Sequence, residues 1–265
     1  MSAPGGVERE PILLHEVEDG VARVTLNRPA KRNALNRELV RALDDALAGA
    51  ASDENVRVVA LSGAGPDFCS GADLAELERI AAMGRAESLE DARALGSLFR
   101  RMRAHPRPIV AVVHGRALAG GCGLATACDL VLARDDAEFG YPEVHLGFVP
   151  ALVMTILRRK TGEGRAFDLV VRGDRFGADE AYRLGLVNRV FAPADFETGV
   201  ARYLTSLAAK PSSAVALTKS LLYELDAMDF DAGIERAAEV NVEARMTEAC
   251  REGVRRFLDK SATDR

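Results

Sequence analysis

Residues 115–129 read GRALAGGCGLATACD, a stretch in which glycines alternate with other small side chains. The stretch follows an apolar run, residues 109–113, that has the length and composition of a buried β-strand. A glycine-bearing corner between a strand and a helix leaves backbone N–H groups unpaired and lets a ligand oxygen approach the main chain. The segment therefore predicts either an anion-stabilising corner or an ordinary tight turn.

A second corner of the same kind occupies residues 67–74, which read DFCSGADL. Two such corners that face each other can form an oxyanion hole, which is a pair of donors preorganised for a developing negative charge. Neither corner matches the GxGxxG or GxxxxGK[ST] phosphate-binding patterns. For each corner alone, a turn without a ligand remains the alternative.

A carboxylate, Glu143, lies in the mostly apolar stretch of residues 139–147. Apolar surroundings raise the pKa of a carboxyl group toward neutrality, as a general acid or base requires. The alternative is a carboxylate at a helix start, where the helix dipole favours negative charge. His145, two residues further on, is expected either at the surface or behind the site.

The first two-thirds of the chain alternates strand-like runs with helical patterns, which predicts a layered α/β core. Asp19-Gly20 predicts a hairpin turn because this pair tolerates positive φ, and Asn36 is a suitable N-cap for the helix after it. The predicted strands are residues 12–17, 21–27, 56–61, 109–113 and 130–133.

From about residue 151 the strand signals fade and helical patterns dominate. The predicted helices are residues 152–159, 164–171, 178–184, 196–208, 212–223 and 247–258. No Gly/Ser-rich linker separates the two parts, so the sequence predicts one compact unit with a helical appendage. The N-terminal tail, residues 1–11, is expected to be disordered.

Composition narrows the classes of partner. The 265 residues include 35 Lys plus Arg and 40 Asp plus Glu, for a formal charge of −5, which argues against nucleic acid as the main partner. The apolar runs are too short for a membrane span. The cysteines, Cys69, Cys122, Cys128 and Cys250, lack disulfide-scaffold or zinc-site spacing. The sequence therefore predicts no metal, no membrane contact and a cytoplasmic location.

Taken together, residues 12–260 resemble the crotonase, or enoyl-CoA hydratase/isomerase, superfamily. The resemblance rests on motifs in a fixed order: LNRP (26–29) with NALN (33–36), FCSGADL (68–74), GGCGL (120–124) running to ACD (127–129), FGYPE (139–143), ADEA (178–181) with LGLV (184–187), and Glu252-Gly253 with Phe257 and Lys260. It implies an α/β fold, a crotonase-type spiral of ββα units over residues 12–195. The helical region, residues 196–265, would then join subunits into a homotrimer or a dimer of trimers.

Family members bind acyl-CoA thioesters and stabilise an enolate at the thioester oxygen through two backbone N–H groups. Carried over by position, the donors are Ser70 and Gly120, and Glu143 moves the proton. Coenzyme A is part of the substrate, so no separate cofactor is implied. The residues implied to contact acyl-CoA are Lys31, Arg32, Ala34, Ser70, Gly71, Ala72, Asp73, Leu74, Gly120, Gly121, Gly123, Phe257 and Lys260. For Lys31 and Arg32, a solvated basic turn is the alternative.

The chain departs from the family pattern at Gly123, where two-carboxylate hydratases have a glutamate. The resemblance as a whole predicts hydration of a 2-enoyl-CoA to a 3-hydroxyacyl-CoA. The missing glutamate favours double-bond isomerisation, which the later glutamate alone can perform. Thioester hydrolysis, dehalogenation and decarboxylation, which other family members perform, are less favoured because they need residues that the sequence does not place. A different alternative is a catalytically weak acyl-CoA-binding or assembly protein that keeps the fold and has lost half of its site.

Overall fold

The structure is a computed structural model that describes residues 10–263, apart from the side chains of Leu74 and of residues 261–263. All but two residues of the tail predicted to be disordered, residues 1–11, lie outside this range. Among the described residues, no helix has the length and apolar character needed to cross a membrane.

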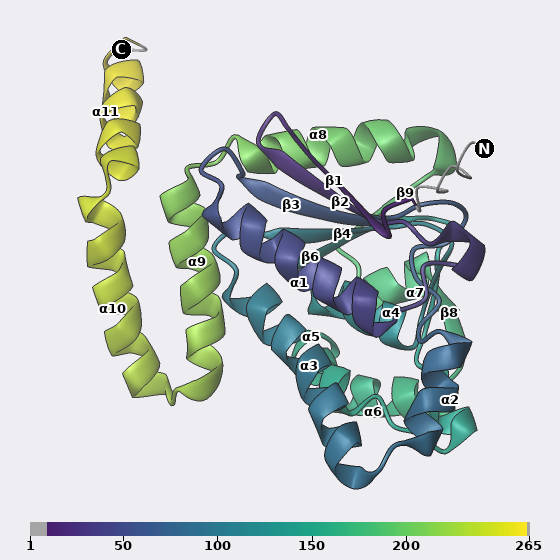
Figure 1. The fold of residues 1–265 in the computed structure, drawn as a ribbon. Coiled ribbons are helices and arrows are strands. Elements are labelled where there is room, and N and C mark those ends of the chain that lie inside the picture. Colours follow the sequence, from purple (N-terminus) through teal and green to yellow (C-terminus); the bar gives the residue numbers. More distant parts are fainter. Residues whose placement is uncertain (1–9, 264–265) are drawn as a thin grey trace, which may run out of the picture.

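Two sheets form the centre of the molecule (Figure 1). The larger has the order β1-β2-β3-β4-β6-β9, in which β1 and β2 are antiparallel and all later neighbours are parallel. Its strands are β1 (Leu13–Glu18), β2 (Val21–Leu26), β3 (Val58–Gly63), β4 (Ile109–Val113), β6 (Leu130–Arg134) and β9 (Arg189–Phe191). The smaller sheet contains β5 (Arg116–Leu118), β7 (Glu138–Gly140) and β8 (Arg175–Gly177).

Local sequence signals account for the first elements. Asp19 and Gly20 have φ values of 50° and 80° and join β1 to β2, as the hairpin prediction requires. The Asn36 side chain accepts a hydrogen bond from the backbone N–H of Leu39 and caps α1. The predicted layered α/β fold is confirmed.

Helices cover both faces of the larger sheet. The α-helices of the described residues are α1 (Arg37–Ser52), α2 (Leu74–Ala82), α3 (Arg85–Ala104), α4 (Gly120–Ala127), α5 (Ala151–Thr161), α6 (Glu163–Arg172), α7 (Ala178–Arg183), α8 (Phe196–Ala208), α9 (Ser212–Glu224), α10 (Phe230–Met246) and α11 (Glu248–Thr263). In β3, Val59 and Leu61 face the core with α1 and α3, while Val58 and Ala60 face Val200 of α8. This alternation is that of a strand buried on both faces.

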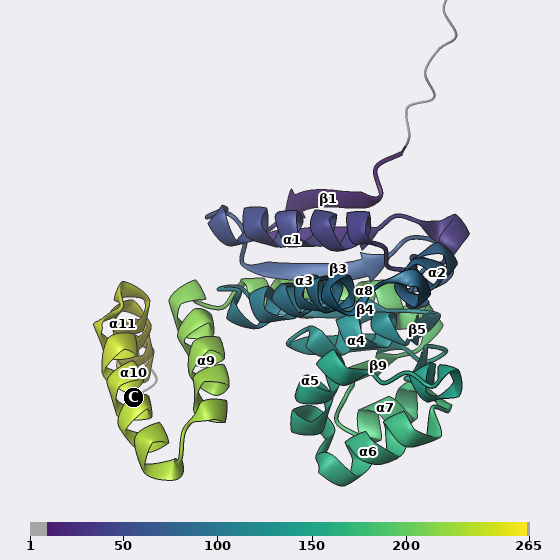
Figure 2. The ribbon, with the colours of Figure 1, turned by 60° about the horizontal axis from the view of Figure 1, so that its bottom comes forward.

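Helices α9, α10 and α11 together are called the C-terminal arm below. Three short 3-10 helices lie near the candidate site or within this arm: η1 (Pro29–Lys31), η2 (Pro142–Leu146) and η4 (Leu225–Ala227). Helices α9, α10 and α11 stand beside the core, with α10 and α11 farthest from it in both views (Figures 1 and 2). Helix α8, by contrast, packs directly on the larger sheet.

The sequence missed several elements for physical reasons. Strands β5, β7, β8 and β9 each have three residues, which is too few for a periodic pattern to show in the sequence. Because β8 and β9 lie after residue 151, the expectation that this part of the chain is helical throughout is wrong. Helix α10 was missed because only Gly233 and Val240 of its 17 residues are buried, and the apolar pattern of such a helix is weak.

Candidate active site

The two glycine-bearing corners lie side by side in the structure. Cys69 forms a parallel bridge with Ala117, in which its N–H donates to the Arg116 carbonyl at 2.9 Å and its carbonyl accepts from Leu118 at 3.0 Å. The two main chains approach closely at Gly121, where a Cβ would lie 2.1 Å from the Cys69 carbonyl oxygen. Glycine at this position therefore permits the two main chains to meet.

The backbone hydrogen bonds of the corners distinguish paired from unpaired donors. The Ser70 N–H donates to the Arg32 carbonyl at 3.0 Å, so this predicted oxyanion donor is already occupied. Leu35 donates to the Gly71 carbonyl at 2.6 Å and accepts from Asp73 at 3.1 Å, a parallel bridge that turns the Ala72 N–H away from Leu35. Among the described residues, the N–H groups of Ala72 and Gly120 have no protein acceptor. Of the two predicted donors, the N–H of Ser70 is therefore occupied within the protein and that of Gly120 is not.

Helix α4 begins directly after a backbone conformation unusual for alanine. Ala119 has φ 49° and ψ −124°, and its N–H donates to the Gly140 carbonyl at 2.9 Å. A residue with a Cβ held in such a region costs about 1–3 kcal/mol, and such strain is concentrated at functional sites. The next residue, Gly120, presents its N–H at the helix N-terminus, where the helix dipole is positive.

Glu143 is half-buried and lies in η2, the short helix that directly follows β7. Its Oε2 atom is buried and has no hydrogen-bond partner. Burial raises the pKa of Glu143 above its usual range, while the hydrogen bond to its own backbone amide partly opposes this shift. The predicted rise in pKa is confirmed, and its cause is loss of solvation of the charged form.

An internal ion pair holds the residues around the second corner, residues 67–74. The Arg28 guanidinium lies 2.6 Å from Asp73 Oδ2 and also donates to the Ala34 carbonyl. Arg28 lowers the pKa of Asp73, whose other oxygen accepts from the Ala75 N–H at 3.2 Å and caps α2. The carboxylate of Asp73 is thus engaged within the protein.

Asn33 holds the same corner through side-chain hydrogen bonds, a role that was not predicted from the sequence. It is fully buried with φ 55°, and its Nδ2 donates to the carbonyls of Ala64 and Asp67 at 2.8 and 2.7 Å. Its Oδ1 accepts from the Arg28 N–H at 2.9 Å. The LNRP and NALN motifs contained this signal, because buried polar side chains must find partners.

The remaining predicted residues divide into two groups. Lys31 and Arg32 are exposed beside the second corner, and Ala34 is buried. Helix α2 begins at Leu74, whose side chain lies outside the described residues. Phe257 and Lys260 are exposed on α11. This helix lies across the molecule from α2 and α4, so one chain does not bring them to the site (Figure 2).

Gly123 packs in an apolar environment within α4. A Cβ at this position would lie 3.4 Å from Val153 Cγ2 and 3.9 Å from Phe99 Cζ. Both neighbours are buried. The space next to Gly123 is therefore filled by hydrocarbon side chains.

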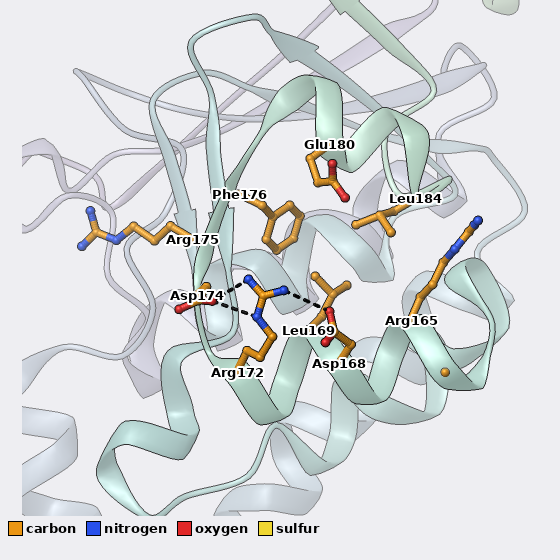
Figure 3. Close-up of a pocket in the computed structure, with 10 residues that line it drawn as sticks. Arg165, Asp168, Leu169, Arg172, Asp174, Arg175, Phe176, Glu180 and Leu184 are labelled. Atoms are coloured by element: carbon orange, nitrogen blue, oxygen red, sulfur yellow. Dashed lines mark hydrogen bonds and ion pairs between the residues drawn. The ribbon is translucent and has the colours of Figure 1, made fainter.

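A cavity of about 330 Å³ lies elsewhere, between α6, β8 and α7 (Figure 3). Its interior contains Phe176 and Leu184, and the Arg172 guanidinium points between Asp174, at 2.7 Å, and Asp168, at 3.4 Å. None of the predicted site residues lines this cavity. Within residues 10–263, no cluster of three His, Cys, Asp or Glu side chains has metal-binding geometry.

Comparisons with known proteins agree with this arrangement. The family model described as enoyl-CoA hydratase/isomerase matches residues 16–264. The 2,3-dehydroadipyl-CoA hydratase of Escherichia coli is 37% identical over 92% of this chain and 94% of that protein. The crotonyl-CoA hydratase of Syntrophomonas wolfei is 35% identical over 95% of this chain and 96% of that protein.

Solved structures agree as well. A crystal structure of an enoyl-CoA hydratase from Mycobacterium smegmatis superposes with a TM-score of 0.90 at 36% identity, covering 95% of this chain and 97% of that one.

Proposed function

Because the chain belongs to the enoyl-CoA hydratase/isomerase family, the crotonase superfamily, we propose that it hydrates a 2-enoyl-CoA to a 3-hydroxyacyl-CoA. The observation that carries the proposal is the buried, unpartnered Oε2 of Glu143. A carboxylate with a raised pKa and no internal hydrogen bond at that oxygen is suited to exchanging protons with a substrate. Relatives that are named hydratases support the same reaction.

The amides of Ala72 and Gly120 would hold the thioester oxygen. As the substrate becomes an enolate, negative charge develops on this oxygen, and fixed donors stabilise it without reorganising. Both N–H groups are free of protein acceptors among residues 10–263. Loss of one such donor costs about 2.7–4 kcal/mol of barrier in comparable sites.

Glu143 would transfer the proton in both halves of the reaction. Its carboxylate takes a proton from water as the water oxygen bonds to C3, and the double-bond electrons move onto the thioester oxygen. The enolate then collapses to the carbonyl as Glu143 returns that proton to C2. The net change is addition of one water molecule, and one carboxylate suffices for it.

Isomerisation is the second candidate because of the packing at Gly123. Val153 and Phe99 leave no second carboxylate at this position to orient a water molecule. In this reaction Glu143 removes a proton from C2 of a 3-enoyl-CoA and returns it at C4. Both reactions use the same donors and the same carboxylate.

The proposal extends to assembly and location. Helices α10 and α11 expose apolar side chains, among them Phe230, Ile234 and Leu258, as expected of surfaces that join copies of one chain. We propose a cytoplasmic homotrimer or dimer of trimers, in which Phe257 and Lys260 contact the coenzyme A of a neighbouring subunit. No cofactor besides the substrate's coenzyme A is included.

The test is the ultraviolet absorbance of the conjugated thioester. Addition of wild-type protein to crotonyl-CoA should bleach the absorbance, whereas a 3-enoyl-CoA should gain it if isomerisation dominates. Glu143→Gln should retain binding of a non-reactive acyl-CoA and lose most turnover. A wild-type protein that binds acyl-CoA without turning over either substrate would contradict the enzyme assignment and favour a binding protein.

A further inference from the structure

A fully buried side-chain hydrogen bond connects the two halves of the site. The Tyr141 hydroxyl lies 2.5 Å from Thr126 Oγ1, and neither residue has any exposed surface. The Thr126 hydroxyl proton is engaged with the Cys122 carbonyl at 2.7 Å, four residues earlier in α4. Because a threonine hydroxyl has one proton, Tyr141 must donate to Thr126.

The two partners belong to the segments that carry the proposed chemistry. Thr126 lies on α4, whose first residue is Gly120, and Tyr141 is the N-cap residue of η2, directly before Pro142 and Glu143. The main chains are already joined by the pairing of β5 with β7 and by the Ala119 to Gly140 hydrogen bond. Pro142 has no N–H, so the main chain lacks a donor at the next position.

From this geometry we propose that Tyr141 and Thr126 are positioning residues that fix Glu143 relative to the Gly120 amide. The inference rests on the proposed function, in which these two groups act on the same substrate. A carboxylate and an oxyanion donor that act on one substrate must be held at a fixed distance and orientation, because a misplacement of about 1 Å can cost about 100-fold in rate. The Tyr141–Thr126 bond joins α4 to the chain two residues before Glu143.

Tyr141→Phe isolates this link with little disturbance of packing. Phenylalanine fills nearly the same volume, and the Thr126 hydroxyl keeps its own acceptor, the Cys122 carbonyl. The buried Cys122 thiol also loses its contact with the Tyr141 hydroxyl, but a thiol is a weak hydrogen-bonding group. Thr126→Ser keeps the hydroxyl and serves as the conservative rescue. Thr161→Val is the matched control, because Thr161 is also buried and donates to the carbonyl four residues earlier, Leu157, on a helix that carries no proposed site group.

We expect Tyr141→Phe to lower kcat for crotonyl-CoA by about 10- to 100-fold. KM and binding of a non-reactive acyl-CoA should change less than twofold, and the acidic limb of the kcat–pH profile should shift. Thr126→Ser and Thr161→Val should stay near wild type. In the Glu143→Gln background, Tyr141→Phe should have no further effect, because the tyrosine acts through that glutamate.

Several results would overturn the proposal. One is a folded Tyr141→Phe variant with kcat within twofold of wild type while Glu143→Gln is inactive. Another is an equal loss in Thr161→Val, which would reveal a general effect of removing buried hydroxyls. Full activity of Glu143→Gln would instead refute the proposed function itself. If Tyr141→Phe does not fold, Thr126→Ala removes the acceptor and is judged by the same kinetic criteria.

Discussion

Glu143 affects the stability of the protein as well as its proposed chemistry. Its carboxyl group loses solvation on folding, and burial raises its pKa above the ordinary value of 4.5. The folded state therefore favours the protonated form, and this contribution to stability is fully present below pH 4.5. It is lost as the pH rises through the folded-state pKa.

Glu143→Gln should consequently stabilise the protein at neutral pH while removing activity. Glutamine cannot ionise, so it avoids the cost of a buried charge. The gain in melting temperature over wild type should be largest above the folded-state pKa of Glu143 and should vanish near pH 4. Glu54→Gln, at an exposed position, is the control, and a pH-independent gain would contradict this account.

Gly123→Glu should fail to add a working second carboxylate. The new Cβ would meet Val153 at 3.4 Å, and the rest of the side chain would have to displace Val153 or Phe99. Such overpacking costs about 1–3 kcal/mol, which chemical denaturation can measure. Gly123→Glu with Val153→Gly creates space and is the matched variant. A folded single variant with an increased ratio of hydration to isomerisation would contradict the prediction.

Gly120→Pro tests the proposed oxyanion donor on the N-terminal residue of α4, a position where helices accept proline. Removing this N–H should lower kcat by at least about 100-fold. The comparison requires circular dichroism to show that the variant is folded. An unchanged rate in the folded variant would mean that the enolate oxygen is held by other groups.

At the scale of elements, a buried polar cluster attaches the C-terminal arm to the core. Lys219 of α9 donates to Asp129 at 2.7 Å and to the carbonyls of Met102 and Arg107 at 3.0 and 3.1 Å. Tyr223 donates to the other oxygen of Asp129 at 2.6 Å. The cluster replaces the solvation that these groups lose, and it fixes the direction in which α9 leaves the sheet.

Lys219→Met should destabilise the protein by about 3–5 kcal/mol, because it leaves Asp129 largely buried without its cation. Urea unfolding monitored by circular dichroism gives the value. Arg158→Met removes a far more exposed ion pair, that with Glu163, and should cost only about 0–1 kcal/mol. Equal losses in the two variants would show that burial is not the cause.

Elements defined by neighbouring residues were predictable, whereas contacts between distant segments were not. Asn36 and Asp19-Gly20 act on residues within the same turn, so their pattern revealed the helix start and the hairpin. The Ser70 N–H is occupied by the Arg32 carbonyl, which only the folded chain brings to Ser70. The packing of Phe99 and Val153 against Gly123 could not be predicted either, because these residues are distant in the sequence and only folding brings them together.

At the scale of the whole molecule, the C-terminal arm accounts for much of the exposed apolar surface. Ile234 and Val242 of α10 are 53% and 54% exposed, and they lie eight residues apart on neighbouring faces of one helix. Light scattering after size exclusion should give three or six times the chain mass of 28.4 kDa. Ile234→Glu with Val242→Glu should reduce this mass, whereas Val17→Glu on β1 should not. A monomeric wild-type protein would contradict the proposed assembly.

The unpaired donors at Ala72 and Gly120 belong to the main chain, and this bears on how the protein can evolve. Every residue except proline supplies an N–H, so most codon changes at Ala72 leave the donor in place. If these N–H groups hold the thioester oxygen as proposed, neighbouring side chains can diverge toward other acyl groups without loss of the two donors. In a saturation library at position 72, proline should stand apart as the variant that loses turnover, and the remaining variants should differ mainly in substrate preference.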